Sequence, residues 1–393
     1  MASAQNEHDE RASALRVERA IVELRRGRTI DVVDSHGVAV VAAIERLHPD
    51  EMSDFVAADG SLSLVLTPER GEALGLVGHP SALEIALPGD TSLQSILRLA
   101  TGMTSIGGEH VEPFRVGQAD PRAAAALTLA RHAQIIPALA TRDPAEDPSE
   151  LPRLHVSIDD IGNYPLIRGR EIQRVSRARV PLTVTENCEF IVYRERFGDA
   201  EHVAIVIDTP DSAKPVPVRL HSACLTGDLL ASLRCDCGDQ LRGAVERIAK
   251  VGGGVVLYLA QEGRGIGLVN KLRAYALQEQ GLDTLQADRH LGFRADERDY
   301  AVACAMLKDL GIDRVVLLTN NPNKIAALDV CEIEVVSRMP LPAPANTHNA
   351  HYLPQPEAAP ALTSDRVLRT RWSSGLARIR SCVGHLMVVK IVR

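Results

Sequence analysis

Three cysteines constrain this chain more than any other feature of its sequence. Cys224, Cys235 and Cys237 lie in the segment HSACLTGDLLASLRCDCGDQL, and a single residue separates the last two. Thiolates are the usual ligands of tetrahedral zinc, and three protein ligands leave a fourth position open for a water molecule. Buried cysteines can also pack as small apolar side chains. Here Arg234 and Asp236 alternate with the cysteines in a stretch without apolar periodicity, so the pattern favours a metal site.

Length and charge narrow the class of protein. The chain has 393 residues, enough for two domains that each bury a core. Its seven cysteines are scattered, and its first residues are polar and charged rather than apolar, so we expect a reducing, cytoplasmic environment. No stretch approaches the roughly 20 apolar residues of a membrane span. A net charge of -7 argues against a general nucleic-acid binder.

Two breaks in composition divide the chain into three predicted parts. Residues 141–152 read TRDPAEDPSELP, where prolines and acidic side chains replace apolar periodicity, as in an exposed linker. After Met339, segments rich in proline and alanine indicate a tail without a packed core. We expect a first domain over residues 1–150, a second over 151–345 and a poorly ordered tail over 346–393.

Apolar runs alternate with helical patterns in the second domain. Residues 202–208, 253–260 and 314–320 are predicted to form buried strands. The segments LVNKLRAYALQEQG and DYAVACAMLKDLG are predicted to form amphipathic helices that end at Gly281 and Gly311. This order indicates an α/β or α+β enzyme-like fold.

Glycines and basic residues follow two of these strands. The strand over 253–260 leads directly into QEGRGIG and a helix, and backbone N–H groups at such a turn bind phosphate well. The spacing matches neither the Walker nor the dinucleotide fingerprint, so a simple tight turn remains an equal alternative. Arg264 in this turn, together with Arg219, Arg234 and Lys324, could form a basic pocket for an anion, although any one of them alone could be a solvated surface charge.

Two further segments carry candidate residues. TNNPNK places Lys324 just beyond a predicted strand, where α/β proteins bind ligands. LGFRADERDY crowds Asp296, Glu297 and Arg298 together. The two acidic residues could instead stabilise the first turn of a helix through its dipole.

Taken in order, the cysteine segment, YLAQEGRGIGLVNKLRAYALQEQGLDT, LGFRADERDY and LLTNNPNK closely resemble GTP cyclohydrolase II over about residues 175 to 350. The resemblance implies a mixed sheet with flanking helices. It also implies the first step of riboflavin biosynthesis, in which GTP is hydrolysed to 2,5-diamino-6-(5-phosphoribosylamino)pyrimidin-4(3H)-one, formate and pyrophosphate. A Zn²⁺ ion held by the three cysteines would activate water for attack on C8 of guanine. Mg²⁺ would accompany the triphosphate, and the family forms homodimers.

The resemblance also implies roles for individual residues. Arg298 corresponds to the family's nucleophile toward the α-phosphorus, and Asp296 to its proton acceptor, which an arginine needs because it normally stays protonated. Tyr275 corresponds to a tyrosine near the reacting ring, or else is a core-facing aromatic. The implied GTP contacts are Arg219, Leu220, His221, Ser222, Gln240, Glu262, Gly263, Arg264, Thr284, Thr319 and Lys324.

The chain departs from the family in places. Ala223 stands where many members have glutamate before the first cysteine, and the end of the chain, with Trp372, differs from the usual finish. The segments LRRGRTIDVVD and LTPERGEALGL carry a fainter resemblance, of residues 17 to about 140, to dihydroxybutanone phosphate synthase. The acidic run that binds Mg²⁺ in that family is missing after Asp34. We expect a degenerate first domain that kept its fold and lost its chemistry, with a structural or regulatory role.

Two other functions stay open at this point. The chain could be a diverged zinc-dependent hydrolase of another nucleotide or pyrimidine, a possibility that Ala223 keeps open. It could also be a non-catalytic GTP-binding regulator. The presence of both Asp296 and Arg298 argues against a pure regulator, which needs no nucleophile and no proton acceptor.

Overall fold

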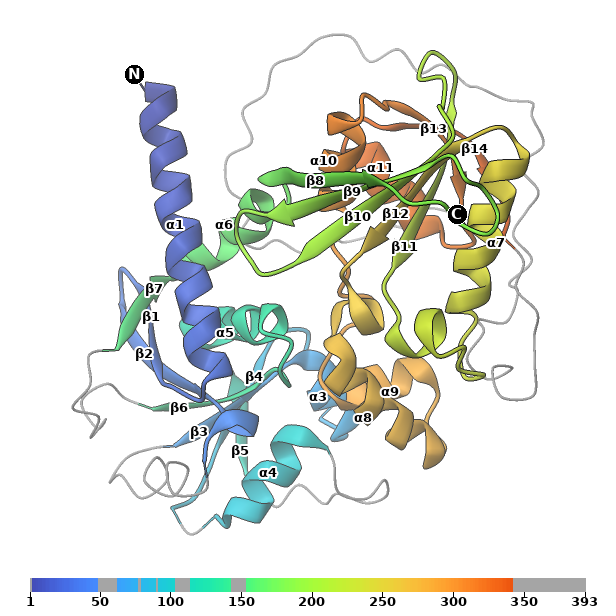
Figure 1. Ribbon diagram of the computed structural model, residues 1–393. Coiled ribbons are helices and arrows are strands. Elements are labelled where there is room, and N and C mark those ends of the chain that lie inside the picture. Colours follow the sequence, from blue (N-terminus) through green and yellow to red (C-terminus); the bar gives the residue numbers. More distant parts are fainter. Residues whose placement is uncertain are drawn as a thin grey trace, which may run out of the picture. The chain divides into compact units, whose positions relative to one another are not determined.

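The computed structural model describes residues 2–48, 62–76, 79–89, 91–102, 114–142 and 153–341, with the side chains from residue 7 onward. Most of the predicted linker and the whole predicted tail lie outside these ranges. The described residues form a mixed α/β structure with two seven-stranded sheets (Figure 1). This agrees with the fold class expected from the sequence.

The first sheet has the order β5-β4-β3-β6-β2-β1-β7 and is antiparallel except for the β1–β7 pair. Its strands are β1 (Ile30–Asp34), β2 (Gly37–Ala43), β3 (Ser63–Leu66), β4 (Leu83–Ala86), β5 (Arg115–Gln118), β6 (Ala138–Arg142) and β7 (Leu154–Ser157). Its helices are α1 (Ala2–Arg25), the 3-10 turn η1 (Ile44–Arg46), α3 (Pro68–Ala73), α4 (Leu93–Thr101), α5 (Pro121–His132) and α6 (Ile158–Arg168). We call residues up to Arg168 the first-sheet region.

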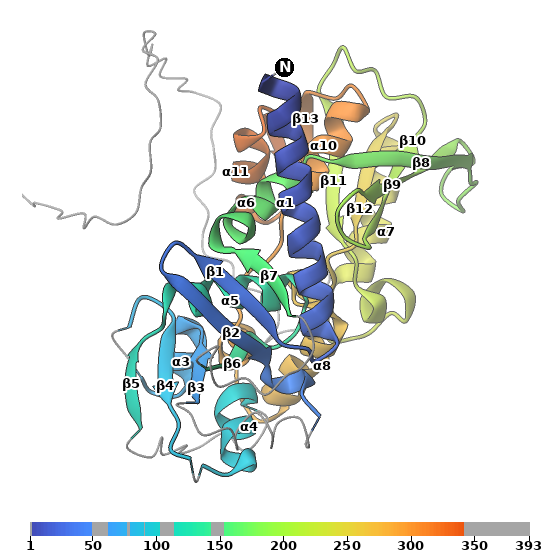
Figure 2. The ribbon, with the colours of Figure 1, turned by 90° about the vertical axis from the view of Figure 1, so that its left-hand side faces the viewer.

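A hydrophobic core packs against each face of the first sheet, because successive side chains of a strand point to opposite faces. In β3, Val65 faces a core built with α1, α5 and α6, while Leu64 and Leu66 face a second core. Figure 2 shows α1 running along α6 and β7, and these elements are in contact. The second core also contains residues from far along the chain, among them Leu277 and Phe293.

The second sheet has the order β14-β13-β11-β12-β10-β9-β8. Its strands are β8 (Ile172–Arg179), β9 (Cys188–Glu195), β10 (Glu201–Ile207), β11 (Val216–Ser222), β12 (Gly254–Leu259), β13 (Arg314–Leu318) and β14 (Glu334–Met339). Neighbouring strands from β14 to β12 are parallel and the remaining pairs are antiparallel, so this is the expected mixed sheet. The connecting elements are the π-helical turn η3 (Leu225–Leu229), α7 (Cys237–Lys250), the 3-10 turn η4 (Glu262–Gly265), α8 (Gly267–Glu279), α9 (Thr284–His290), α10 (Ala301–Asp309) and α11 (Pro322–Val330).

The three predicted strands of this sheet are confirmed as β10, β12 and β13, and the two predicted helices as α8 and α10. The helices stop just before Gly281 and Gly311, whose φ angles of 104° and 69° suit glycine. Because β11, β12 and β13 run parallel, their carboxyl ends meet at one edge of the sheet. Open α/β sheets bind ligands at such an edge.

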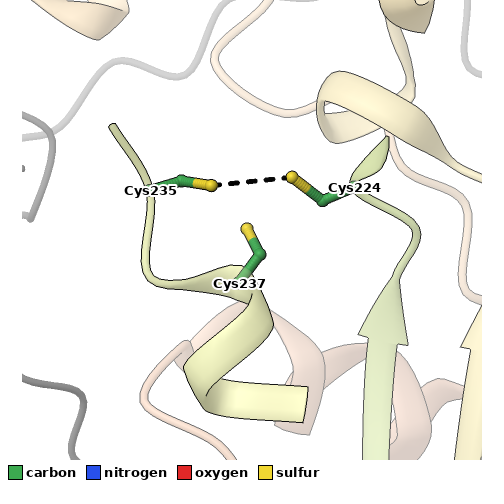
Figure 3. A group of neighbouring side chains, drawn as sticks. All are labelled: Cys224, Cys235 and Cys237. Atoms are coloured by element: carbon green, nitrogen blue, oxygen red, sulfur yellow. Dashed lines mark hydrogen bonds between the residues drawn. The ribbon is translucent and has the colours of Figure 1, made fainter. Parts of the chain in front are cut away.

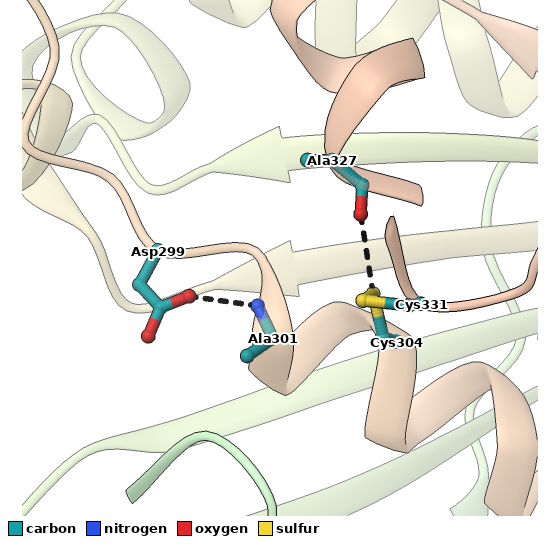
Figure 4. The surroundings of a disulfide bond; sticks show 5 residues. All are labelled: Asp299, Ala301, Cys304, Ala327 and Cys331. Carbon is teal, nitrogen blue, oxygen red and sulfur yellow. Dashed lines mark hydrogen bonds between the residues drawn. A yellow bond between two sulfur atoms is a disulfide. The ribbon is translucent and has the colours of Figure 1, made fainter. Parts of the chain in front are cut away.

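Two further observations complete the fold. Cys304 of α10 and Cys331 after α11 form a disulfide with a Cα–Cα distance of 6.1 Å, which the sequence did not predict (Figure 4). Within the described ranges, every helix is too short or too polar to span a bilayer.

Candidate functional site

The three cysteines converge at the edge of the second sheet (Figure 3). Cys224 follows β11, whereas Cys237 is the first residue of α7. All three sulfur atoms lie within 4.8 Å of one another, and the Cys224 and Cys235 sulfurs are 3.6 Å apart. Tetrahedral zinc with Zn–S bonds of about 2.3 Å separates its sulfur ligands by about 3.8 Å. The donor set therefore fits a metal ion of this kind.

Gly227 has no side chain, and this leaves room for the three sulfur atoms to approach one another. A Cβ atom on Gly227 would lie 2.7 Å from the Cys235 sulfur and 3.1 Å from the Cys224 sulfur. The backbone N–H of Gly227 also points at the Cys224 sulfur, at 3.3 Å. Hydrogen bonds from the Cys235 and Cys237 thiols lower the pKa of Cys224, and the same contacts with Cys224 raise the pKa of Cys235 and of Cys237. In the absence of a metal ion, the contacts therefore favour negative charge on the Cys224 sulfur.

A polar network fixes the strand that leads to Cys224. Asp228 accepts hydrogen bonds from the backbone N–H of Cys224 at 2.9 Å and from the Tyr258 hydroxyl at 3.0 Å. The same carboxylate contacts Nε2 of His221 at 3.1 Å, and the His221 ring stacks on Tyr258. His221 is buried, which lowers its pKa. These contacts hold the turn after β11 in place.

Lys271 joins the cysteines to the turn after β12. Its ammonium lies 2.9 Å from the Cys224 sulfur and 2.7 Å from the Glu262 carboxylate. The other oxygen of Glu262 accepts the backbone N–H of Leu225 at 2.6 Å. Tyr275, one turn further along α8, is buried and faces Lys271, with 5.8 Å between the ammonium and the ring centroid. Tyr275 is thus both a buried aromatic and a neighbour of the cysteine group.

Two buried cations are Arg219 of β11 and Lys324 in the first turn of α11. Arg219 donates to the Leu318 carbonyl at 3.0 Å and to the Gln240 side chain, while Lys324 donates to the Leu220 carbonyl at 2.7 Å. Both are only 5% exposed. Burial lowers the pKa of Arg219 to about 10 and that of Lys324 well below its usual range, and the charge of Arg219 adds to the effect on Lys324. Among the described residues, neither forms an ion pair with a carboxylate.

Asp296 and Arg298 form a bidentate ion pair in the loop before α10. The Arg298 Nε donates to one carboxylate oxygen of Asp296 at 2.7 Å and an Nη donates to the other, and the backbone N–H of Arg298 adds a third bond. The charges of Arg298 and Asp296 both act on buried Lys324, so the structure brings these predicted residues together. Because α10 begins at Ala301, the alternative of Asp296 and Glu297 as first-turn acids is wrong.

The glycine-rich turn packs on this loop. Gly263 and Arg264 have φ angles of 62° and 59°, and a Cβ on Gly265 would lie 2.8 Å from the Glu297 backbone. The Arg264 carbonyl accepts the Glu297 N–H at 3.1 Å. The Arg264 guanidinium lies 3.6 Å from Asp288, whose burial raises its pKa to about 7. The turn therefore connects β12 to α8 and also packs against the loop that contains Arg298.

The remaining residues that are predicted to bind substrate lie in different surroundings. Thr319 is buried and its hydroxyl caps the turn into α11, while Ser222 ends β11 beside the cysteine turn. The Leu220 side chain lies in the core, so only its backbone faces Lys324. Thr284 opens α9 and accepts a hydrogen bond from Gln278 at 3.2 Å, and none of its hydrogen bonds within the described part of the chain reaches the other predicted residues.

Sequence reasoning missed Asp228, Lys271 and Tyr258. For one of them, Lys271, the sequence contains a weak signal. Lys271 stands one helical turn before Tyr275 on a helix face that is otherwise buried, and a buried lysine requires a partner.

Comparisons with known proteins show which proteins the chain is similar to. The family model described as GTP cyclohydrolase II matches residues 173–340. A GTP cyclohydrolase-2 from Azospirillum brasilense is 43% identical over 349 residues, which are 86% of this chain and 91% of that protein. A GTP cyclohydrolase-2 from Azotobacter vinelandii is 57% identical over 153 residues, which are 39% of this chain and 74% of that protein. Among solved structures, RibBX, a two-domain 3,4-dihydroxy-2-butanone 4-phosphate synthase from A. baumannii, covers 84% of this chain and 99% of its own, at 18% identity and a TM-score of 0.30.

Proposed function

The chain belongs to the GTP cyclohydrolase II family, and we propose that Cys224, Cys235 and Cys237 hold the zinc ion with which it opens the imidazole ring of GTP. The reaction releases formate and pyrophosphate and begins riboflavin biosynthesis. The observation that carries the proposal is the grouping of three thiols with two buried cations, Arg219 and Lys324, on both of which the charge of Cys237 acts and neither of which has an ion-pair partner among the described residues.

The thiols suit zinc in type and spacing. Their separations match a tetrahedral sulfur site, and three protein ligands leave one position open. A bound zinc ion supplies hydroxide near neutral pH by lowering the pKa of its water. Glu262 and Lys271 are hydrogen-bonded to each other beside Cys224, and we assign them to binding and orienting the guanine.

The buried cations suit a triphosphate. A buried ammonium or guanidinium without a carboxylate partner costs folding energy unless an anion compensates it. Arg219 and Lys324 are such groups, so we assign them to the phosphates, together with the backbone of Gly263 and Arg264. Mg²⁺ would arrive bound to the phosphate oxygens as part of the substrate.

The Asp296–Arg298 pair suits release of pyrophosphate. A guanidinium becomes nucleophilic only when a base takes its proton, and the Asp296 carboxylate contacts both Nε and Nη of Arg298. In the proposed step a nitrogen of Arg298 bonds to the α-phosphorus, its proton goes to Asp296, and the bond to pyrophosphate breaks. Water then hydrolyses the N–P bond and restores the arginine.

A variant series tests these assignments on full-length, zinc-analysed protein. Formate and pyrophosphate are followed together from GTP. We expect Cys235→Ser to lose zinc and formate release, and Arg298→Ala to lose pyrophosphate release while it keeps zinc. Matched controls are Cys188→Ser, a buried cysteine on β9 outside the group, and Arg294→Ala, an exposed arginine in the same loop.

Three outcomes would contradict the proposal. Cys235→Ser with full zinc content would remove the metal assignment, and Arg298→Ala with unchanged pyrophosphate release would remove the nucleophile. Wild-type protein that binds zinc and leaves GTP intact would favour a different nucleotide substrate or a regulator.

A further inference from the structure

The helices after the glycine-rich turn are anchored to the first-sheet region. Leu277 of α8 and Ala287 of α9 share a buried core with β3, β4 and α4. Polar contacts run beside this core. The side chain of Asn270 donates to the Gln134 carbonyl at 2.9 Å, and the Thr67 hydroxyl donates to the Gly292 carbonyl at 2.8 Å. The segment that leads to Arg298 therefore rests on residues that precede it by more than a hundred positions.

Arg70 locks this attachment. It is 1% exposed and donates to the carbonyls of Leu99, Arg98 and His290, at the ends of α4 and α9. Carbonyls at the end of a helix have no partner within it, so a buried guanidinium that serves two such ends joins them firmly. The loop after α9 starts from this fixed point.

Arg131 contacts the loop that contains Asp296 and Arg298. It is the penultimate residue of α5, and its guanidinium contacts Glu69 of α3 at 3.2 Å and Glu297 at 3.3 Å. The Glu297 side chain also accepts the backbone N–H of Arg294 at 2.9 Å, which closes the loop. The Glu297 side chain is 11% exposed and the Arg131 side chain is 13% exposed, so water screens the ion pair between them little. Glu297 stands between the proposed base Asp296 and the proposed nucleophile Arg298.

We propose that Arg131 is a positioning residue for the reaction, through which the first-sheet region sets the geometry of the Asp296–Arg298 loop. This inference rests on the proposed function of that loop. It also gives the first-sheet region a role that does not require chemistry of its own. None of the contacts that Arg131 makes with described residues involves the cysteine group, Arg219 or Lys324, so it acts through Glu297.

The physical reason is orientation. Arg298 must meet a phosphorus atom in line with the leaving pyrophosphate, and small errors in such an arrangement slow a reaction by up to about 100-fold. The loop has further supports in the Glu297 N–H bond to Arg264 and in the close packing on Gly265. Loss of Arg131 should therefore misalign the loop without unfolding it.

The test is a double-mutant cycle on the full chain with Arg131→Ala, Glu297→Gln and the combined variant, with GTP turnover, zinc content and melting temperature measured for each. We expect kcat to fall about 10- to 100-fold in both single variants, with KM and zinc content close to wild type. The combined variant should lose no more than either single variant, because both act through one contact. Arg131→Lys should recover part of kcat, since a lysine can still pair with Glu297.

A matched control is Glu45→Gln. Glu45 pairs with Arg273 of α8 and so bridges the same two parts of the chain, but away from the loop. Its kcat should stay at the wild-type value. Wild-type turnover with unchanged kcat in Arg131→Ala would overturn this inference and leave the proposed function standing. Additive losses in the combined variant, or an equal loss in Glu45→Gln, would reduce Arg131 to a general structural contact and also overturn it. A wild-type protein that leaves GTP intact would remove the proposed function and this inference with it.

Discussion

Replacement of Gly227 by alanine tests the metal centre with the smallest possible change. The φ angle of Gly227 lies outside the left-handed region, so alanine brings no backbone strain there. Its Cβ would lie 2.7 Å from the Cys235 sulfur, 3.0 Å from the Cys237 Cβ and 3.1 Å from the Cys224 sulfur. Ordinary van der Waals contacts begin at 3.4 Å, so all three atoms would be too close to the new Cβ. The Cys235 sulfur, which is the closest, must move by about 0.7 Å.

A shift of this size exceeds what a zinc site tolerates. Metal–ligand distances hold to about 0.2 Å, and lesser disturbances around a zinc site cost about 10- to 100-fold in affinity. We therefore expect Gly227→Ala to bind zinc at least about 10-fold more weakly, with a parallel loss of formate release. The assay is competition for zinc against a chelator of known affinity, followed by GTP turnover.

Gly243→Ala is the matched control for this change. Gly243 lies inside α7, and a Cβ there meets only the Leu341 side chain, at an ordinary 3.9 Å. It should bind zinc as the wild type does and gain up to about 1 kcal/mol in unfolding free energy from helix propensity. Wild-type zinc affinity in Gly227→Ala would refute the idea that the three sulfurs converge on one ion across Gly227.

Three other predictions concern binding, pH and redox state. Lys324→Ala should raise KM for GTP about 10- to 100-fold, as loss of a charge-assisted phosphate contact does. Its melting temperature should stay level or rise, because the change removes a buried cation whose pKa is lowered by burial. A lower melting temperature with unchanged KM would contradict this. Asp288 has its folded pKa raised to about 7, so its contribution to stability is present below its unfolded pKa and is lost as pH rises. From pH 5 to 7 the wild type should lose about 2 kcal/mol of unfolding free energy relative to Asp288→Asn in urea titrations, and parallel pH profiles would contradict this. Reduction of the Cys304–Cys331 disulfide, whose cysteines are 27 positions apart, should lower the unfolding free energy by about 3 to 4 kcal/mol, whereas Cys331→Ser should not respond to reductant.

Much of the site could be predicted from the sequence because its parts are local. The CDC spacing, the glycines after a buried strand and the DER triplet each lie within a few residues. The cysteine segment and the glycines each follow a strand whose apolar run marks it as buried, so the carboxyl edge of a sheet is their expected meeting place. The DER triplet instead follows α9, and no strand before it indicates where it lies.

The rest depends on contacts that no local pattern encodes. Most strands of the second sheet lie between Arg131 and Glu297 in the sequence. Only the tertiary fold brings the two side chains to 3.3 Å from each other. The pairing of Cys304 with Cys331 is equally hidden, because seven cysteines allow many pairings. Lys271 appeared only as one charge on an amphipathic helix, and its partners Cys224 and Glu262 come from two other turns.

The stoichiometry of GTP turnover by the wild-type chain tests the central claim most directly. One formate and one pyrophosphate should appear for each GTP consumed by zinc-loaded protein, because we propose that the cysteine group and the Asp296–Arg298 pair act on one substrate molecule, and the charges of Cys237, Asp296 and Arg298 all act on Lys324. Pyrophosphate without formate, or no turnover by protein that contains zinc, would contradict this account.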